Sequence, residues 1–474
     1  MKRTSMSRRL AQFLVGTVAV SLLGLAFSLT ANAASLDPNF GSNGTVIYRH
    51  GGTLEHASSL VDYTGRVSAM TEDREGRIIV GGGSGAYLLV QRYLSSGRLD
   101  PTFGIDGTVR LEELYRSGLP DYSPDPSEVA PVVKAIGTTR SGKVILATET
   151  GEFFSSQPIF RETIMQLNED GTLDPSFGDR AGGILGLTQS NPRSVAVIPR
   201  GGFYTGGETK SSVHGGGGQV YSGYISRRSA YGHLFEAFGE LRLEPGVRHF
   251  IPAKPPRFSS VSKVMRYRSG KVLVGGYDRN RFFLSKLDSS GRPWKRFGNA
   301  APGKSVLHFG GRNCRCVVTG GDFALDKRGR IVQVGFSDYP RGQQTTIALA
   351  RYKTNGHLDK RFGRRGFSRV TVRPRAYSRA IAIQRNGKIV VAAWKGGPGF
   401  SKFLVLRFLA SGKPDRKFFN RGRYTADIGI DSTADKVLID MKGRIVVAGG
   451  AAINNEGSFV IKRFLPWKKS PGGK

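Results

Sequence analysis

Residues 298–305 have the types and spacing of a phosphate-binding loop. They read Gly-Asn-Ala-Ala-Pro-Gly-Lys-Ser and match Gly-x-x-x-x-Gly-Lys-Ser at every defined position. Such a loop holds phosphate where it joins a strand to a helix, because the amides at the helix N-terminus bind the anion. Residues 306–309, Val-Leu-His-Phe, read instead as a strand. No nucleotide site is therefore expected here.

Two other short motifs could do chemistry but lack the residues that would complete them. His214 is followed by three glycines, as in the oxyanion loop of some esterases, but no Gly-x-Ser-x-Gly occurs in the chain to supply a nucleophile. Cys314 and Cys316 are the only cysteines, and zinc would need two more ligands where only His308 is close in sequence. We interpret the pair as a strained disulfide or as two free thiols, and expect neither a metal nor any other cofactor.

The elements that would position such residues belong to a repeat. A tag of the form Leu-Asp-Pro-x-Phe-Gly begins at Leu36, Leu99 and Leu173, and a variant, Leu-Asp-Lys-Arg-Phe-Gly, begins at Leu358. With three weaker copies, the seven tag phenylalanines lie about sixty residues apart and are Phe40, Phe103, Phe177, Phe238, Phe297, Phe362 and Phe418. A repeat of this length with its own strands is typical of a radial or solenoid array.

Each repeat unit is predicted to contain four short antiparallel strands. In one unit read in full, strands are expected at residues 67–71, 77–81, 87–94 and 107–110, separated by turns. The tag lies between the third and fourth strands, and its proline makes it a corner because proline cannot donate to a β-ladder. Four strands in each of seven units predict an all-β fold, a seven-bladed β-propeller of four-stranded antiparallel blades.

The two ends of the chain predict how the ring closes. The last unit stops after residues 460–464, before any tag or fourth strand, whereas residues 36–48 supply a tag and a strand that belong to no other unit. We therefore expect the N-terminal strand to complete the C-terminal blade. An open solenoid would need a cap at each end and would not need this offset.

These motifs resemble the delta-60 repeat family of bacterial exported proteins. The resemblance rests on the tag and on a Gly-Arg or Gly-Lys turn followed by a β-branched run, as at residues 76–80 and 387–391. It covers nearly all of residues 34–474 and implies one propeller-like β domain. It implies no catalytic residues, because the family has no established activity to carry over.

The start of the chain has the pattern of a secretory signal peptide. Four cations precede an apolar run at residues 13–29, which ends in Ala31-Asn32-Ala33. We therefore expect residues 1–33 to be removed and the rest to be exported to the periplasm or the cell exterior. Arg8-Arg9 leaves open the twin-arginine route as well as general secretion. The net charge of +35 favours anionic partners.

One basic position recurs in the third strand of the units. Six of its seven occupants are cationic, namely Arg92, Arg227, Lys286, Arg351, Arg407 and Arg463, and Gln166 is the seventh. These residues could form a ring that binds an anion, or each could pair with the tag aspartate eight residues later, as Arg92 with Asp100. The tag residues are expected to be structural, with the phenylalanines in the core between blades. Five tags contain both the aspartate and the phenylalanine, and these pairs are Asp37 and Phe40, Asp100 and Phe103, Asp174 and Phe177, Asp359 and Phe362, and Asp415 and Phe418.

Residues 360–380 are a candidate anion-binding segment. They carry eight cations and no acid, namely Lys360, Arg361, Arg364, Arg365, Arg369, Arg373, Arg375 and Arg379. Phe362, Phe367 and Tyr377 are interleaved with them, a mixture that could hold a polyanion by charge and stacking. The alternative is a solvated blade edge whose charge prevents pairing with another sheet.

Taken together, the sequence favours an exported, monomeric, non-enzymatic propeller that binds or scaffolds. The expected partner is an anionic cell-envelope polymer, reached through basic loops, or another exported protein, and nucleic acid is less favoured. The alternative is a lyase or hydrolase that acts on an anionic polysaccharide at the mouth of the central channel. A channel lined by Glu, His or Tyr would favour the enzyme, and one lined by small or aliphatic residues would favour the scaffold.

Overall fold

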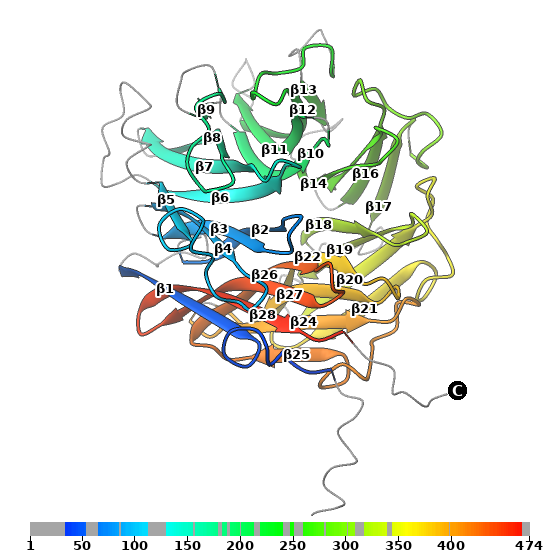
Figure 1. Ribbon diagram of the computed structural model, residues 1–474. Coiled ribbons are helices and arrows are strands. Elements are labelled where there is room, and N and C mark those ends of the chain that lie inside the picture. The colour runs from blue at the N-terminus through cyan, green and yellow to red at the C-terminus, as the bar shows by residue number, and fades with distance from the viewer. Residues whose placement is uncertain are drawn as a thin grey trace, which may run out of the picture.

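The strands of this protein are arranged as seven sheets around one axis (Figure 1). The computed structural model describes residues 34–53, 65–84, 87–111, 129–154, 157–178, 183–186, 190–199, 201–212, 219–239, 247–250, 259–278, 281–300, 302–308, 317–338, 344–397 and 399–466. Each sheet has four antiparallel strands, so the predicted seven-bladed β-propeller is confirmed. Within these ranges no helix is long and apolar enough to cross a membrane.

Six blades are built from consecutive strands, each running from the innermost to the outermost strand. Blades 1 to 3 are β2 (Val67–Glu72), β3 (Ile78–Ser84), β4 (Tyr87–Tyr93) and β5 (Thr108–Leu111); β6 (Val129–Thr138), β7 (Val144–Phe154), β8 (Gln157–Leu167) and β9 (Ile184–Gly186); and β10 (Ser190–Val197), β11 (Phe203–Ser212), β12 (Gln219–Arg228) and β13 (Val247–Phe250). Blades 4 to 6 are β14 (Ser259–Arg266), β15 (Val272–Asp278), β16 (Arg281–Leu287) and β17 (Lys304–His308); β18 (Val317–Leu325), β19 (Ile331–Asp338), β20 (Thr345–Tyr352) and β21 (Phe367–Val372); and β22 (Ala376–Ile383), β23 (Ile389–Lys395), β24 (Lys402–Phe408) and β25 (Arg423–Ala426).

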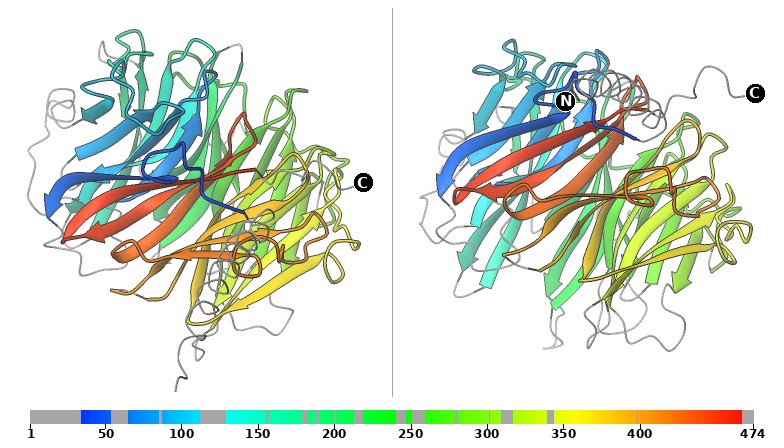
Figure 2. Two further views of the ribbon diagram at one scale, coloured as in Figure 1. Left: turned by 60° about the horizontal axis from the view of Figure 1, so that its bottom comes forward. Right: turned by 90° about the horizontal axis from the view of Figure 1, so that it is seen from below.

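Blade 7 contains both ends of the described chain. Its inner strands are β26 (Ile430–Ile439), β27 (Ile445–Ile453) and β28 (Glu456–Phe464), and its outermost strand is β1 (Thr45–Thr53). β1 runs antiparallel to β28, with Thr45 opposite Lys462 and Arg49 opposite Ser458, and Figure 2 shows the two strands side by side in blue and red. The predicted closure of the ring by the N-terminal strand is therefore confirmed.

Small residues in the second strand of a blade allow neighbouring blades to approach closely. A Cβ atom on Gly81 of β3 would lie 2.8 Å from the Ile136 side chain of blade 2, and one on Gly275 of β15 would lie 2.4 Å from the Phe323 ring of blade 5. Protein interiors are close-packed, so a larger side chain at either position would force the blades apart. This explains why the second strand of a blade begins with β-branched residues and continues with small residues.

Candidate anion-binding sites

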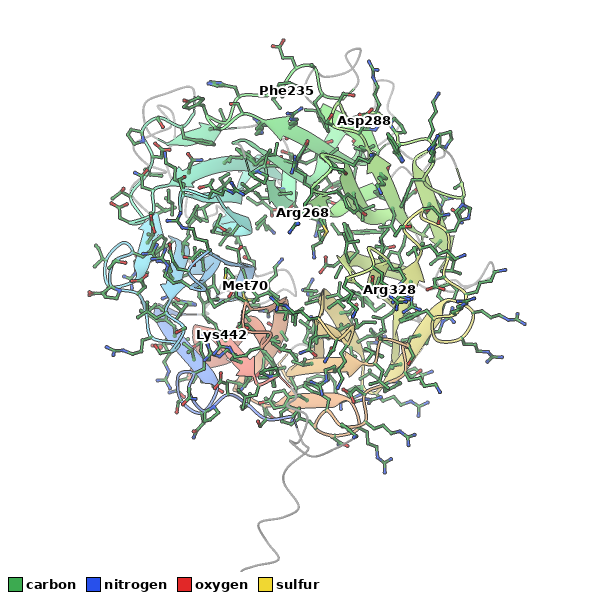
Figure 3. All side chains as sticks on the ribbon, turned by 45° about the vertical axis from the view of Figure 1, so that its right-hand side comes forward. Met70, Phe235, Arg268, Asp288, Arg328 and Lys442 are labelled. Atoms are coloured by element: carbon green, nitrogen blue, oxygen red, sulfur yellow. The ribbon has the colours of Figure 1, made fainter. Side chains whose placement is uncertain are left out.

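The central channel is one of two places where charged side chains gather. It encloses about 500 Å³ and is lined by the innermost strand of every blade, from β2 to β26. Each innermost strand contacts the next one around the ring. Figure 3 shows Met70, which lines the channel, beside the central opening.

A β-bulge in every innermost strand decides which side chains enter the channel. In six of these strands the pairing with the second strand skips one residue, as between Val67 and Ala69 in β2 and between Ala434 and Lys436 in β26, and in β18 it skips two, Gly321 and Asp322. A bulge leaves this residue unpaired and changes the direction of its side chain. Six of the bulged residues line the channel, namely Ser68, Lys134, Arg193, Ser262, Arg379 and Asp435.

Most of the charged side chains in the channel are already paired with an acid. The four pairs are Lys134 with Glu149 at 3.2 Å, Arg193 with Glu208 at 2.8 Å, Lys263 with Asp322 at 2.9 Å and Arg379 with Asp435 at 3.4 Å. Asp322 also accepts a hydrogen bond of 2.9 Å from the backbone N–H of Ile381 in the next blade. These pairs join strands and blades, and they reduce the charge that the channel offers to a ligand.

Lys436 differs from the other described lysines of the channel, because no carboxylate of the described residues lies within ion-pairing distance of it. Burial lowers the pKa of Lys436 from 10.5 to about 8, although Asp322 and Asp435 oppose the shift. An amine with this pKa is partly neutral in mildly alkaline solution. It could therefore accept a proton from a substrate in the channel.

A group of glutamate and tyrosine side chains lies at the interface between blades 2 and 3. Tyr224 Oη and Ser190 Oγ both donate to Glu162 Oε2, at 2.5 and 2.8 Å, and all three residues are buried. Burial, assisted by the charge of Glu162, raises the pKa of Tyr224 well above its ordinary value. Such a tyrosine stays protonated and donates to Glu162, so the group acts as a contact between the two blades. The channel itself mixes cations, two aspartates, the aromatic residues Tyr277 and Phe336, and small or aliphatic residues, and fits neither expected lining.

The second gathering of charge surrounds the tags. In blade 6 the buried Arg407 guanidinium donates to Asp415 Oδ2 at 2.9 Å and lies 4.4 Å above the centroid of the Phe418 ring. Lys388 Nζ lies 2.9 Å from the same carboxylate. Burial alone would raise the pKa of Asp415, but the Lys388 hydrogen bond and the Arg407 charge outweigh it and lower the pKa. The equivalent ion pairs are Arg92 with Asp100 at 2.7 Å, Arg351 with Asp359 at 2.9 Å and Arg463 with Asp37 at 2.8 Å.

The tags also join each of these blades to the next. The backbone N–H of Gly363 donates to the carbonyl of Ser411, 2.8 Å away in blade 6, and the Gly104 N–H does the same to Asp170 in blade 2 at 2.6 Å. A Cβ atom on Gly412 would lie only 2.8 Å from the Phe362 ring, which is completely buried. The buried Asp and Phe of a tag are thus structural, and the third-strand arginines that contact them do not form an open ring of cations.

Blades 3 and 4 replace the tag aspartate with an aromatic residue. Phe235 takes this position in blade 3 and Trp294 in blade 4. The Arg227 guanidinium lies 4.0 Å above the Phe235 ring, and Lys271 Nζ lies 3.9 Å above the Trp294 ring. A cation over an aromatic face therefore replaces the ion pair in these two blades.

The segment with eight cations is divided by the boundary between blades 5 and 6. Lys360, Arg361, Arg364 and Arg365 are exposed at the tag corner of blade 5, and Arg369 is exposed on the outermost strand β21. The remaining members are Arg373 and Arg375 in the connection to β22, and Arg379 in the channel. The structure therefore gathers five of the predicted residues at the rim and separates Arg379 from them.

The aromatic residues of this segment are not available for stacking on a ligand. Phe362 is completely buried. Tyr377 packs against Trp394 and Phe336, with ring centroids 4.2 and 5.0 Å apart. The Arg369 guanidinium lies 4.6 Å above the Phe367 ring. Binding of a polyanion here would rest on charge, and the edge position of β21 also agrees with the alternative of a charged, protected blade edge.

The motifs that could do chemistry do not form a site among the described residues. The residues that resemble a phosphate-binding loop lead into β17, a strand, as expected from the sequence. Burial lowers the pKa of Lys304, whose ammonium lies 5.2 Å above the Phe283 ring. His214, Cys314 and Cys316 lie outside the described residues, as do residues 1–33. In the described ranges no group of His, Cys, Asp and Glu could hold a metal ion.

The first turn of the blades carries exposed cations that sequence reasoning did not single out. They are Arg74, Arg140, Arg268, Lys327, Arg328, Arg385 and Lys442, all between the first and second strands. The first turns lie at the same strand ends as the tags, because the strands alternate in direction. We call this side the tag face. Figure 3 shows Arg268 beside the central opening, Arg328 and Lys442 farther out, and Phe235 and Asp288 at the rim. The signal in the sequence is a cation within three residues before the turn glycine.

Comparison with known proteins supports the fold. The family model "Domain of unknown function (DUF5122) beta-propeller" matches residues 141–177, which run from the first turn of blade 2 to its tag phenylalanine. This agrees with a β-propeller family and covers part of one blade. No curated protein matches the chain.

Solved structures resemble the chain only distantly. A polysaccharide lyase, Uly1, has a TM-score of 0.47 and 10% identity over 86% of this chain and 91% of its own. A prolyl endopeptidase structure has a TM-score of 0.41 and 13% identity over 86% of this chain and 51% of its own. The endo-arabinase from Bacteroides thetaiotaomicron VPI-5482 has a TM-score of 0.32 and 13% identity over 59% of this chain and 95% of its own. Similarity at this level implies nothing about what the chain does.

Proposed function

We propose that this protein is an exported, non-enzymatic binding module for an anionic polymer of the cell envelope, and that the tag face is its binding face. The signal-peptide pattern of residues 1–33 and the net charge of +35 support this proposal. The polymer would be held by exposed cations at turns and tag corners, while the β-sheets act as a rigid scaffold.

The observation that carries the proposal is the difference in pairing between the channel and the tag face. Four channel cations have a carboxylate within 3.4 Å or less. On the tag face, Lys360, Arg361, Arg364, Arg365 and Arg328 are exposed and have no acid of the described residues within ion-pairing distance. Cations held in pairs offer little to a ligand, whereas unpaired exposed cations can bind anions at no cost in lost internal contacts.

A binding assay against several polyanions at two salt concentrations tests the proposal. We expect the protein without residues 1–33 to bind anionic polymers and to ignore neutral glycans of similar length. Affinity should fall steeply as salt rises, because charged contacts release counterions. Binding to no polyanion at low salt, or binding that salt does not weaken, would show the proposal to be wrong.

A second candidate is a lyase or hydrolase acting on an anionic polysaccharide in the channel. Lys436 favours it, because a lysine with a pKa of about 8 can act as a general base. The test is incubation with anionic polysaccharides, followed by measurement of new reducing ends and of unsaturated products. Release of either by the wild type, and its loss in Lys436→Met, would replace the binding module with this enzyme.

A further inference from the structure

The tags of three consecutive blades present a pair of cations where the other tags present neutral or acidic residues. The two residues before the tag phenylalanine are Lys295 and Arg296 in blade 4, Lys360 and Arg361 in blade 5, and Arg416 and Lys417 in blade 6. We call these six residues the basic belt. All six are exposed. In blades 7, 1 and 2 the same positions hold Pro38 and Asn39, Pro101 and Thr102, and Pro175 and Ser176, and in blade 3 they hold Glu236 and Ala237.

The belt is continuous because the tag of one blade touches the turn that precedes the tag of the next blade. The N–H of Gly298, which follows the blade 4 tag, donates to the carbonyl of Asn355 in blade 5 at 2.9 Å, and the N–H of Gly363 donates to Ser411 of blade 6 at 2.8 Å. Arg423 Nη2 on β25 reaches the carbonyl of Thr371 on β21 at 3.4 Å. The three tag corners therefore lie side by side along the rim of the propeller.

Few negative charges interrupt this stretch of the rim. In blade 4 the only acid between residues 287 and 304 is Asp288, which is half-buried and accepts hydrogen bonds from Ser290 and from the backbone of Arg292. In blades 5 and 6, between residues 353 and 373 and between residues 409 and 426, the only acids are Asp359 and Asp415. Both are buried and engaged by lysine or arginine inside their blades. The contact that the belt offers is a one-sided positive potential, which attracts extended polyanions.

We propose that the basic belt is the docking track for a linear anionic glycan, laid along the tag corners of blades 4, 5 and 6. This inference rests on the proposed function and names its surface. Exposed guanidinium and ammonium groups suit carboxylate, sulfate or phosphate substituents spaced along a chain. The three pairs recur once per blade, so each blade contacts the polymer in turn.

The aromatic residues of the belt decide between a glycan and a single-stranded nucleic acid. Proteins that bind single strands present aromatic rings on which the bases stack. Here Phe362 and Phe418 are completely buried, and Lys271 Nζ lies 3.9 Å above one face of the Trp294 ring, which is 36% exposed. Binding by charge alone therefore favours the glycan.

Two of the three pairs of the belt can be removed by giving the tags of blades 5 and 6 the sequence of blade 1. The variant is Lys360→Pro, Arg361→Thr, Arg416→Pro and Lys417→Thr, which restores Asp-Pro-Thr-Phe in two tags. Among the described residues neither Lys360 nor Arg416 uses its backbone N–H in a hydrogen bond, so proline costs no such bond. In blade 1 Thr102 Oγ1 accepts from Arg92 Nη2 at 2.9 Å, whereas Nη1 and Nη2 of Arg407 lack such a partner. We therefore expect this belt variant to fold at least as stably as the wild type.

The matched control removes the same charge from the other half of the ring. It carries Arg98→Gln, Arg110→Gln, Arg140→Gln and Lys442→Gln, all exposed and located in blades 1, 2 and 7. Both variants lose four cations, so the two variants have the same net charge as each other. A difference in affinity between the two variants therefore shows that the location of the cations matters, and not only their number.

The experiment compares both variants with the wild type for polygalacturonate, inorganic polyphosphate and single-stranded oligothymidylate. The belt variant should bind polygalacturonate about tenfold more weakly than the wild type, and the control should lose less than about threefold. Equal losses in the two variants would overturn the belt while leaving the proposed function in place. Binding of none of the three polymers by the wild type would overturn both.

Two further outcomes identify the partner. Tighter binding of polyphosphate than of polygalacturonate, lost in the belt variant, would keep the belt and assign it to a phosphate-bearing glycan. Preferential binding of oligothymidylate would overturn the glycan and make the belt a nucleic-acid surface. Circular dichroism and thermal unfolding of each variant show whether a loss of binding reflects a loss of folding.

Discussion

The tags of blades 7, 1 and 2 and those of blades 5 and 6 are alike inside and different outside. All five bury an aspartate that accepts from a cation of the blade and a phenylalanine that packs against the next blade. Their two exposed residues are neutral in the first group and both cationic in the second. The comparison teaches that the buried positions are fixed by the ring, which needs the same contact at each joint, whereas the exposed positions are free of that constraint. Under our proposal the exposed cations of blades 5 and 6 contact a partner that binds on one side.

The most damaging change to either half should be loss of a tag phenylalanine. We expect Phe103→Ala and Phe362→Ala each to lower the free energy of unfolding by about 3–5 kcal/mol, because each opens a cavity between two blades. Urea denaturation followed by circular dichroism measures both. A loss below about 1 kcal/mol in one variant alone would mean that the two halves are not equivalent inside.

A smaller loss should follow removal of a third-strand cation, and its size should depend on what the cation contacts. Arg407→Met leaves Asp415 buried with Lys388 as its partner and should cost about 3 kcal/mol. Arg227→Met removes a cation over the Phe235 ring and should cost about 1 kcal/mol. Chemical denaturation of the two variants checks the order. Equal costs would show that the ion pair and the aromatic contact stabilise their blades to the same extent.

The fold could be predicted from the sequence because the residues that define it are repeated and buried. Phe40, Phe103 and their equivalents identify the interface between one blade and the next. The offset between residues 36–48 and 460–464 predicts that the N-terminal strand closes the ring. The channel lining could not be predicted in the same way. Which residue of β2 or β26 enters the channel depends on a bulge, and a bulge is a property of the pairing between two strands.

The candidate site was predicted in part, and the reason is also geometric. Lys360 and Arg379 belong to one basic segment of the sequence, yet the chain crosses from the outermost strand of blade 5 to the innermost strand of blade 6 between them. Proximity along the chain therefore predicted a larger basic patch than the structure brings together. The pairs Lys295-Arg296 and Arg416-Lys417 lie far from Lys360 in the sequence, but they belong to the two blades that flank blade 5 in the ring. They become visible only when the tags are aligned on their phenylalanines.

The channel and the tag face should also differ in their response to pH. Lys436 has a pKa of about 8 in the folded protein and 10.5 when unperturbed, so between these values the unfolded chain binds more protons. The stability that this lysine contributes is therefore present above pH 10.5, and it is lost as pH falls through about 8. Lys436→Met should be more stable than the wild type at pH 7, and the difference should shrink on going to pH 10.5.

Thermal unfolding of both proteins across this range measures the effect. Lys462, whose pKa burial also lowers to about 8, is present in both and cancels in the comparison. A constant difference between the two proteins from pH 7 to pH 10.5 would contradict the prediction. Glycan binding at the belt should be the same for both proteins at pH 7, because Lys436 lines the channel.

The smallest expected effect comes from moving the belt's chemistry into the neutral half. Pro38→Lys with Asn39→Arg gives the blade 7 tag, which precedes the blade 1 tag in the ring, the exposed pair found in blade 5. Blade 7 also adjoins blade 6, so the graft lengthens the belt by one blade and should raise affinity for polygalacturonate about threefold at low salt. Pro101→Gln with Pro175→Gln leaves the charge unchanged and should not alter affinity. A second graft places the same two cations at Glu236 and Ala237 in blade 3, next to blade 4. If both grafts raise the affinity equally, the binding track can be extended in both directions. If neither graft raises the affinity, the three blades of the belt already span the segment of glycan that is bound.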